Sequence, residues 1–264
     1  MRGDHRDGRV RIVAVGVGGG GGRVVHRLRA TSPGAVELTA IDADHLAPHR
    51  RPQLGERLAG AGVVLVTAGM GGGTGTGGTA VVAGLARTAG ALTIGVVTRP
   101  FRFEGRARSR TAAAGIEHLR ERTDSVVVVA NDRLAQVIEK RTTLEEAYCI
   151  AADVMRHAVQ AVAGPIASPG LAPLGVADAR SLLANAGEAT LGIGVATGSD
   201  RAAAAARQAV TCPLLETPVG SAQRVLCTVT AGPDLTPAEC QQAAEIVMSA
   251  ASPYSRMREI RNTS

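Results

Sequence analysis

The chain has 264 residues, enough to bury a sizeable core in one large domain or two modest ones. Hydrophobic residues make up 45% of the sequence, so we do not expect disorder, although aromatic residues contribute only 2%. The net charge of +6 comes from scattered arginines without interleaved aromatic residues, which does not favour nucleic acid as a partner.

Neither the cysteines nor the N-terminus indicates export or membrane insertion. The four cysteines show no metal-ligand or Cys-x-x-Cys spacing, which predicts reduced thiols and no metal site. Residues 1–10 are charged and lack the apolar core of a signal peptide. No stretch approaches the ~20 apolar residues that a membrane helix needs. The sequence therefore predicts a soluble, cytoplasmic protein without a transmembrane segment.

The first 130 residues alternate between apolar strands and helical patterns. Strands are expected at 10–18, 36–41, 63–67, 92–98 and 125–130, and helices at 23–30, 79–89 and 108–122. Because helices separate the strands at this spacing, the pattern predicts an α/β fold with a doubly wound parallel sheet.

A long central helix and a smaller α/β unit are expected in the remainder. Apolar residues recur at helical spacing over 142–162, and a Pro/Gly-rich segment then marks a boundary. Further helices are expected at 177–185, 201–210 and 237–249, strands at 191–196 and 225–230, and a frayed basic tail at the end. We expect three parts: a first domain over 1–141, a central helix and linker over 142–166, and a second domain over 167–264.

The first of two glycine clusters spans residues 16–22, between a strand and a helix. Glycines let the backbone approach a phosphate, and helix N-terminal amides direct partial positive charge at the anion. The cluster contains a GxGxxG pattern at Gly16, Gly18 and Gly21, and Asp42 ends the next strand. Since this is also typical of a dinucleotide-binding Rossmann fold, the cluster alone leaves an oxidoreductase open.

The second cluster, AGMGGGTGTGG at 68–78, favours a different class. It too follows a strand and precedes a helix, which a flexible linker would not do, and its threonine hydroxyls can donate to phosphate oxygens. A nicotinamide enzyme has no use for a second phosphate loop, so the oxidoreductase becomes a remote alternative. The string GGGTGTGG resembles the signature of the tubulin/FtsZ family, and the resemblance extends over most of the chain.

This resemblance implies a guanine-nucleotide site. TRPFRFEGRARS at 98–109 is similar to the loop whose Glu and Arg contact ribose, and NDRL at 131–134 is similar to a segment that approaches the base. LEEAYCIAADVM at 144–155 is similar to the start of the family's central helix, with Tyr148 in place of a Phe stacked on guanine. The implied nucleotide-binding residues are Gly18, Gly19, Gly20, Gly21, Arg23, Gly71, Gly72, Gly73, Thr74, Gly75, Thr76, Gly77, Glu104, Arg108, Asn131 and Tyr148. The implied ligands are GTP or GDP, with Mg²⁺ as a candidate companion of GTP.

The chain also resembles the family's second, activation-type domain, through CPLLE at 212–216 and VTAGPDL at 229–235. It ends after the 237–249 helix, so we expect this domain to be truncated, without the family's last strands.

Several departures from the family's pattern lie around the nucleotide. The segment 44–60 is too short for the family's helix and the loop that wraps the γ-phosphate, which predicts similar affinities for GTP and GDP. Arg23 replaces an Asn, and Ala152 occupies the guanine-reading position, with Asp153 rotated off that face of the helix. The preference for guanine over adenine is therefore left open. A β-branched residue at Gly75 is expected to abolish binding by blocking the phosphate path.

The loop that positions the attacking water is also changed. In LAPLGVADARSLL at 171–183, Pro173 stands for an Asn and Gly175 for the first carboxylate, and only Asp178 is kept. Losing a positioned acid or base typically costs about 10²–10⁴-fold in rate. Asp178 is a weak catalytic candidate, because helix capping or dipole compensation explains it equally well.

The resulting hypothesis is an FtsZ-like guanine-nucleotide-binding protein linked to bacterial cell-division filaments, with GTP hydrolysis weak or lost. The alternative is an interaction protein that caps or modulates filaments of a complete FtsZ. Partners would be full-length FtsZ or a second copy of the chain in head-to-tail contact.

Overall fold

A six-stranded parallel sheet forms the centre of the protein, as the sequence predicts. The computed structural model describes residues 10–263 except 32, 33, 35, 137, 140, 168–173, 253 and 254. The strand order across the sheet is β2 (Glu37–Ile41), β1 (Ile12–Val17), β3 (Val63–Gly69), β4 (Leu92–Arg99), β5 (Ser125–Ala130) and β6 (Gly187–Ala189). Each neighbouring pair is parallel, so all six carboxyl ends lie along one edge.

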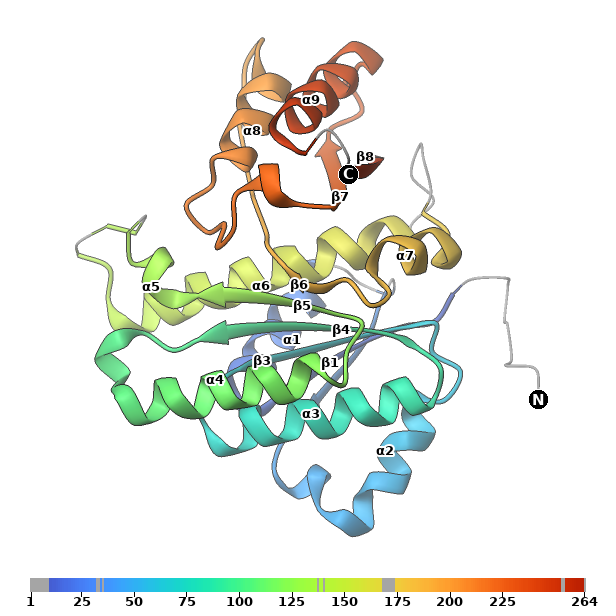
Figure 1. Ribbon diagram of the computed structural model, residues 1–264, viewed down its shortest axis with the longest axis vertical. Coiled ribbons are helices and arrows are strands. Elements are labelled where there is room, and N and C mark those ends of the chain that lie inside the picture. The colour runs from blue at the N-terminus through green and yellow to red at the C-terminus, as the bar shows by residue number, and fades with distance from the viewer. Residues whose placement is uncertain are drawn as a thin grey trace.

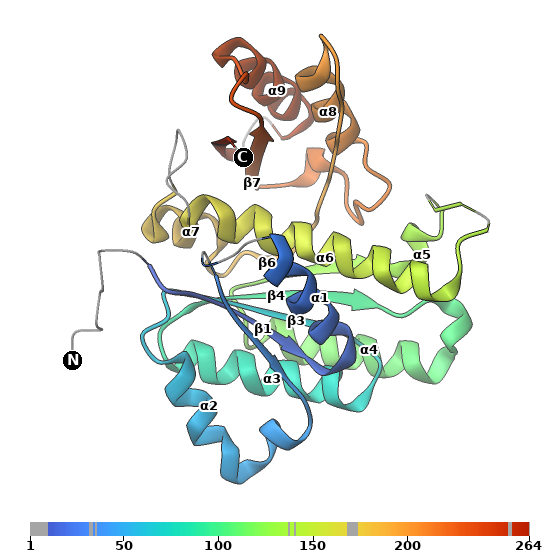
Figure 2. The same ribbon diagram turned by 180° about the vertical axis from the view of Figure 1, so that it is seen from behind.

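Helices cover both faces of this sheet (Figure 1, Figure 2). One face packs against α1 (Gly18–Thr31) and α6 (Leu144–Ala167), and the other against α2 (Arg51–Leu58), α3 (Gly73–Thr88) and α4 (Arg106–Arg120). Successive side chains of β1 alternate between the two layers, with Ile12 facing the first and Val13 the second. Burial on both faces explains why these strands are continuous Val-rich runs. Short elements connect them: η2 (Asp44–Leu46), η3 (Pro48–Arg50), η4 (Arg102–Glu104) and α5 (Asn131–Leu134).

A smaller unit lies beyond α6, on the side away from α3 and α4 (Figure 1). It follows α7 (Val176–Leu183) and consists of α8 (Arg201–Val210), η5 (Val219–Ser221), β7 (Arg224–Ala231), α9 (Pro237–Ala250) and β8 (Arg256–Thr263). We call residues 190–263 the second unit. The proposed boundaries at residues 141 and 166 stay a prediction. None of the described helices combines the length and the apolar character that crossing a membrane demands.

The later part of each glycine cluster is helical, which the sequence analysis missed. α1 begins at Gly18 rather than Arg23, and α3 begins at Gly73 rather than Thr79. Glycine has low intrinsic helix propensity, but tertiary packing overrides it here. A Cβ on Gly21 would collide with the carbonyl oxygen of Thr67, so the bare helix backbone packs directly against β3.

Two expectations for the last third of the chain are wrong. The segment 191–196 forms no strand, because Gly192 and Gly194 bring its backbone against α8, where a Cβ would collide with carbonyl oxygens of that helix. The tail is not frayed and the chain does not stop after α9, because β8 pairs with β7 along its whole length. The segment 44–60 is also not too short for a helix, since it contains α2.

α6 continues to Ala167, past the predicted end at Val162, and runs through Pro165. A proline within a helix leaves the carbonyl four residues earlier without its amide partner. That carbonyl belongs to Ala161, and it accepts a hydrogen bond of 3.2 Å from the Thr228 hydroxyl on β7. A side chain of the second unit therefore replaces the bond that Pro165 removes.

Replacing Thr228 by valine is expected to lower the free energy of unfolding by about 1–3 kcal/mol, because the Ala161 carbonyl then lacks a partner. Urea denaturation measures this difference. Thr228→Ser keeps the hydroxyl and is the matched control. A loss in Thr228→Ser with none in Thr228→Val would show that the packing of the methyl group, rather than the hydrogen bond, matters.

Candidate nucleotide-binding site

The two glycine clusters meet at the centre of the sheet. β1 and β3 are neighbours, and the chain leaves β1 for β2 on one side before it returns to β3 on the other. Such a topological switch point is where open α/β sheets bind ligands. The two clusters also touch backbone to backbone: a Cβ on Gly20 would lie 2.8 Å from the amide nitrogen of Gly69, and one on Gly18 would lie 3.3 Å from that of Gly75.

Several sources of positive electrostatic potential surround the place where the two glycine clusters meet. α1 and α3 both begin inside the glycine clusters, so their free N-terminal amides lie beside each other. Both first turns are fully described, and neither carries an acidic residue that would oppose an anion. The side chains of Arg23 and Arg108 line the same cavity. Two helix N-termini and two guanidinium groups are what a polyphosphate requires.

A cavity of about 490 Å³ lies over these amides. The sequence-predicted residues that line it are Gly18, Gly19, Gly20, Arg23, Gly72, Gly73, Thr74, Gly75, Glu104, Arg108, Asn131 and Tyr148. These residues come from the segments that follow β1, β3, β4 and β5 and from the start of α6, so the fold brings together segments far apart in the sequence.

The other predicted residues do not line the cavity. Gly21 packs against β3 as described above. Gly71 has a positive φ of 104°, approaches the backbone of Arg108, and donates its N–H to the Thr76 hydroxyl at 2.8 Å. Thr76 therefore shapes the loop. Gly77 faces open space one turn further along α3.

Gly75 lines the cavity, but the reason given for its substitution is wrong. A Cβ on Gly75 would collide with the carbonyl oxygen of Gly69 instead of entering the path of a phosphate. A valine there would disrupt the packing of α3 on β3. Gly73 is a better probe, because no described atom lies within 4 Å of a Cβ at that position.

Aromatic residues gather at the end of the cavity beside α6. The chain has only two Phe, two Tyr and no Trp. Phe101 packs edge-on against Tyr148 with ring centroids 5.6 Å apart, and stacks on Phe103 at 5.0 Å. The guanidinium of Arg23 lies 5.8 Å from the centre of the Tyr148 ring. In a chain so poor in aromatic residues, three of the four form one cluster suited to stacking with a planar base.

Glu104 is fixed at the wall next to this cluster. Its side chain is only 7% exposed, accepts the N–H of Phe101 at 2.8 Å and pairs with Arg108 at 3.3 Å. Burial, and secondarily the Glu104 carboxylate, raise the pKa of the Tyr148 phenol. A carboxylate offers about four lone-pair sites, so Glu104 can accept from a hydroxyl group of a ligand in addition to these partners.

Asn131 supplies the least satisfied polar group at the cavity. It is 3% exposed, and its Oδ1 has no hydrogen-bond partner among the described residues. A buried acceptor that lines a cavity without a partner is explained most simply by a ligand donor.

An apolar stripe of α6 completes the wall, and of its residues the sequence analysis singled out only Ala152, at the position where the family reads guanine. Ala151, Ala152 and Met155 line the cavity with Tyr148, at the spacing of one helix face. Asp153 instead pairs with Arg27 of α1 at 2.6 Å. The i, i+3, i+4, i+7 pattern was available in the sequence, but it indicates a core face and a cavity wall equally well. Val17, Gly69, Met70, Thr98 and Pro100 also line the cavity unpredicted.

Asp178 does not approach this cavity. It lies in the first turn of α7, and Figure 1 shows α7 beside one end of α6 and α5 beside the other. The 24 residues of α6 span about 36 Å. Gly175 is the N-cap residue of α7, whereas Pro173 lies outside the described residues.

Two family models match the chain: the Tubulin/FtsZ family GTPase domain over residues 41–139, and the FtsZ family C-terminal domain over residues 187–258. A solved FtsZ W319Y mutant from M. jannaschii is 28% identical, with a TM-score of 0.91 over 98% of this chain and 88% of that one. An empty FtsZ dimer from the same organism is 28% identical, with a TM-score of 0.90 over 97% and 84%. GDP-bound monomeric CetZ1 from Haloferax volcanii is 18% identical, with a TM-score of 0.73 over 97% and 91%, which speaks for the fold alone.

The doubly wound sheet with its long helix α6 and a second α/β unit is the architecture of the tubulin-like GTPase class. Within that class, the chain belongs to the FtsZ/tubulin family as an FtsZ-like member. The family models that match the chain describe a GTPase family, which gives no support to the remote oxidoreductase alternative.

Proposed function

We propose that this chain binds a guanine nucleotide in the cavity over the two glycine clusters. The observation that carries the proposal is the convergence of two helix N-termini, Arg23 and Arg108 on one cavity of about 490 Å³. That volume lies within the usual range of small-ligand sites. Among similar structures, CetZ1 is described as GDP-bound and CetZ2 as a GTPγS-bound protofilament.

Each part of the nucleotide has a matching part of the wall. The phosphates would lie against the amides of 18–20 and 72–75, where glycines leave the backbone bare. Glu104 and Arg108 would hold the ribose, and the base would stack beside Tyr148, within reach of the Asn131 acceptor. No described group of three His, Cys, Asp or Glu side chains could hold a metal, so Mg²⁺ would enter on phosphate oxygens and water.

GDP and GTP are expected to bind with affinities within about tenfold of each other, a difference of about 1.4 kcal/mol. The lining of the cavity includes no residue from the segment 44–60, where the family wraps the γ-phosphate. Calorimetric titration with GDP and GTP tests this expectation, and titration with ADP tests the preference for guanine. No heat with any of the three would reject nucleotide binding, and a GTP preference far above tenfold would show that other residues contact the third phosphate.

We further propose that the chain acts in the cytoplasm beside bacterial cell-division filaments, and that it hydrolyses GTP slowly or not at all when alone. The cavity and the Gly175–Asp178 turn lie at opposite ends of α6, so Asp178 could serve only the cavity of a neighbouring subunit.

This separation favours a second candidate function, capping of a complete FtsZ filament. A head-to-tail interface is heterologous, so a subunit with one competent face adds to a filament but cannot extend it. Gly175 stands where the family presents a carboxylate, so the face that carries α7 would make the weaker of the two contacts along a filament. Sub-stoichiometric addition to polymerising FtsZ from the same cell is expected to shorten the filaments. Unchanged length and phosphate release at equimolar protein would reject capping.

A further inference from the structure

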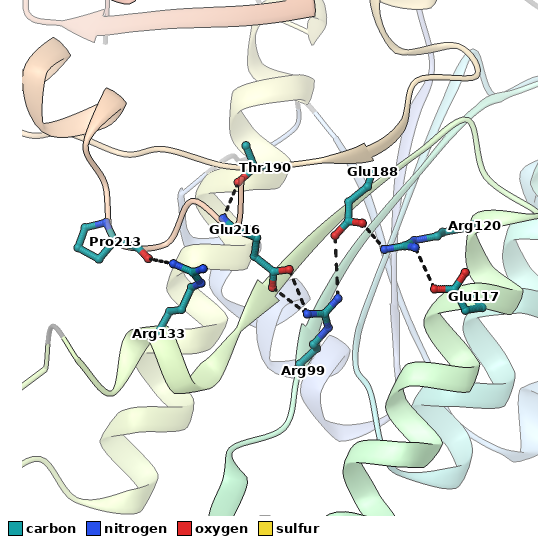
Figure 3. A network of polar contacts seen from close by, with 8 residues as sticks. All are labelled: Arg99, Glu117, Arg120, Arg133, Glu188, Thr190, Pro213 and Glu216. Carbon is teal, nitrogen blue, oxygen red and sulfur yellow. Dashed lines mark hydrogen bonds and ion pairs between the residues drawn. The ribbon is translucent and has the colours of Figure 1, made fainter. Parts of the chain in front are cut away.

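Successive residues at the end of β4 face the cavity and the second unit alternately. Thr98 and Pro100 line the cavity, whereas the side chain of Arg99 between them reaches the second unit (Figure 3). There one of its guanidinium nitrogens donates to both carboxylate oxygens of Glu216, at 3.0 and 3.3 Å. A displacement of the cavity wall at Thr98 and Pro100 must therefore move Arg99 and its partner.

The end of β5 makes a parallel contact. Asn131 lines the cavity, and Arg133, two residues later, donates to the carbonyl oxygen of Pro213 at 3.1 Å (Figure 3). The two arginines hold one short segment of the second unit, residues 212–216, across the carboxyl ends of β4 and β5.

The same network reaches β6 and α4. The amide of Glu216 donates to the Thr190 hydroxyl at 3.1 Å, and Arg99 lies 4.0 Å from Glu188 of β6. Glu188 also pairs with Arg120 near the end of α4 (Figure 3). α4 begins two residues after Glu104 and contains Arg108, the other predicted ribose contact. Through Arg120, the network therefore connects segment 212–216 to the helix on this side of the cavity as well as to the end of β4.

The Arg99–Glu216 pair is the best placed of these contacts to transmit a change. The Glu216 side chain is only 16% exposed, whereas that of Arg99 is 42% exposed. Removing the arginine leaves a mostly buried carboxylate with its main cation gone, which costs more than the loss of a surface ion pair.

We propose that Arg99 is a positioning residue that couples the nucleotide cavity to segment 212–216 through Glu216. This inference rests on the proposed nucleotide binding. Nucleotide that fixes the wall at residues 98–100 stabilises the docked position of segment 212–216, and docking of that segment tightens nucleotide binding by the same factor, because binding linkage is reciprocal.

A double-mutant cycle tests the coupling. Arg99→Gln and Glu216→Gln are each expected to weaken GDP binding by about three- to tenfold, and the double variant to bind no more weakly than either single one. Arg99→Lys keeps the charge and is expected to restore most of the affinity. The matched control is Arg201→Gln, which breaks the pairs with Glu239 and Asp234 inside the second unit and is expected to leave GDP affinity unchanged.

Hydrogen exchange supplies a readout that a purely structural role would not move. GDP is expected to slow amide exchange over 212–216 in the wild type and not in Arg99→Gln. In nucleotide-free protein, Glu216→Gln is expected to accelerate exchange over 98–104, as local opening becomes easier.

Unchanged GDP affinity in both single variants, or additive losses in the double variant, would overturn the coupling. A wild type that binds no nucleotide would instead reject the proposed function. Unchanged rates of amide exchange over 98–104 in nucleotide-free Glu216→Gln would also overturn the coupling, because they would show that the Arg99–Glu216 contact does not affect the cavity wall.

Discussion

Replacing Gly73 by valine is expected to weaken GDP binding by about a hundredfold or more, equivalent to at least about 2.7 kcal/mol. Gly73 is the first residue of α3 and lines the cavity, and no described atom lies within 4 Å of a Cβ there. The protein accommodates the new side chain, which then occupies the space over the N-terminal amides of α3. The ligand loses its approach to those donors, and calorimetric titration measures the loss.

Gly77→Val is the matched control. Gly77 lies one turn further along the same helix, its Cβ position is equally open, and it does not line the cavity. Both substitutions place a β-branched residue in α3, so their melting temperatures are expected to shift alike. A similar loss of affinity in the two variants would place the phosphates elsewhere than over Gly73.

Phosphate release by the isolated chain is expected to be about 10²–10⁴-fold slower than by a complete FtsZ, the usual cost of a missing acid or base. Asp178→Ala is expected to leave this residual rate unchanged in dilute protein, because α6 continues for about 18 Å beyond its last cavity-lining residue, Met155, before the chain reaches α7. Release measured at several protein concentrations tests the expectation. A rapid rate that Asp178→Ala abolishes only in concentrated protein would show that neighbouring subunits still complete the site.

The strands of the large sheet could be predicted because their burial on both faces demands unbroken apolar runs, such as Val126–Val129. The starts of α1 and α3 could not. Glycine disfavours a helix in isolation, and only the close approach of Gly21 and Gly75 to the backbone of β3 makes a helix of glycines the best packed arrangement. That approach is a tertiary fact that no local pattern contains.

The second unit misled the prediction for related reasons. LGIGVA at 191–196 alternates like a strand, but its glycines serve contact with α8 instead of sheet pairing. The Pro/Gly-rich segment indicated a helix end, but α6 runs through Pro165, and the hydroxyl of Thr228, more than sixty residues away along the chain, bonds the carbonyl that Pro165 leaves free.

At the candidate site, the glycine clusters, Glu104, Arg108, Asn131 and Tyr148 could be found because polar or glycine residues at strand ends are hard to explain by packing. The apolar wall of Ala151, Ala152 and Met155 could not, because its residues are the same types that fill a core.

The cradle formed by the glycine clusters is made of backbone, and this has a consequence for its response to acidity. Amide N–H groups do not titrate over the pH range in which proteins are folded. Tyr148, with its raised phenol pKa, stays neutral over the same range. The terminal phosphate of a bound nucleotide ionises for the second time near pH 6 and so changes its own charge near neutral pH. The amides of the cradle present the same partial positive charge at every such pH, so the response of phosphate binding to acidity includes the ionisation of the ligand itself.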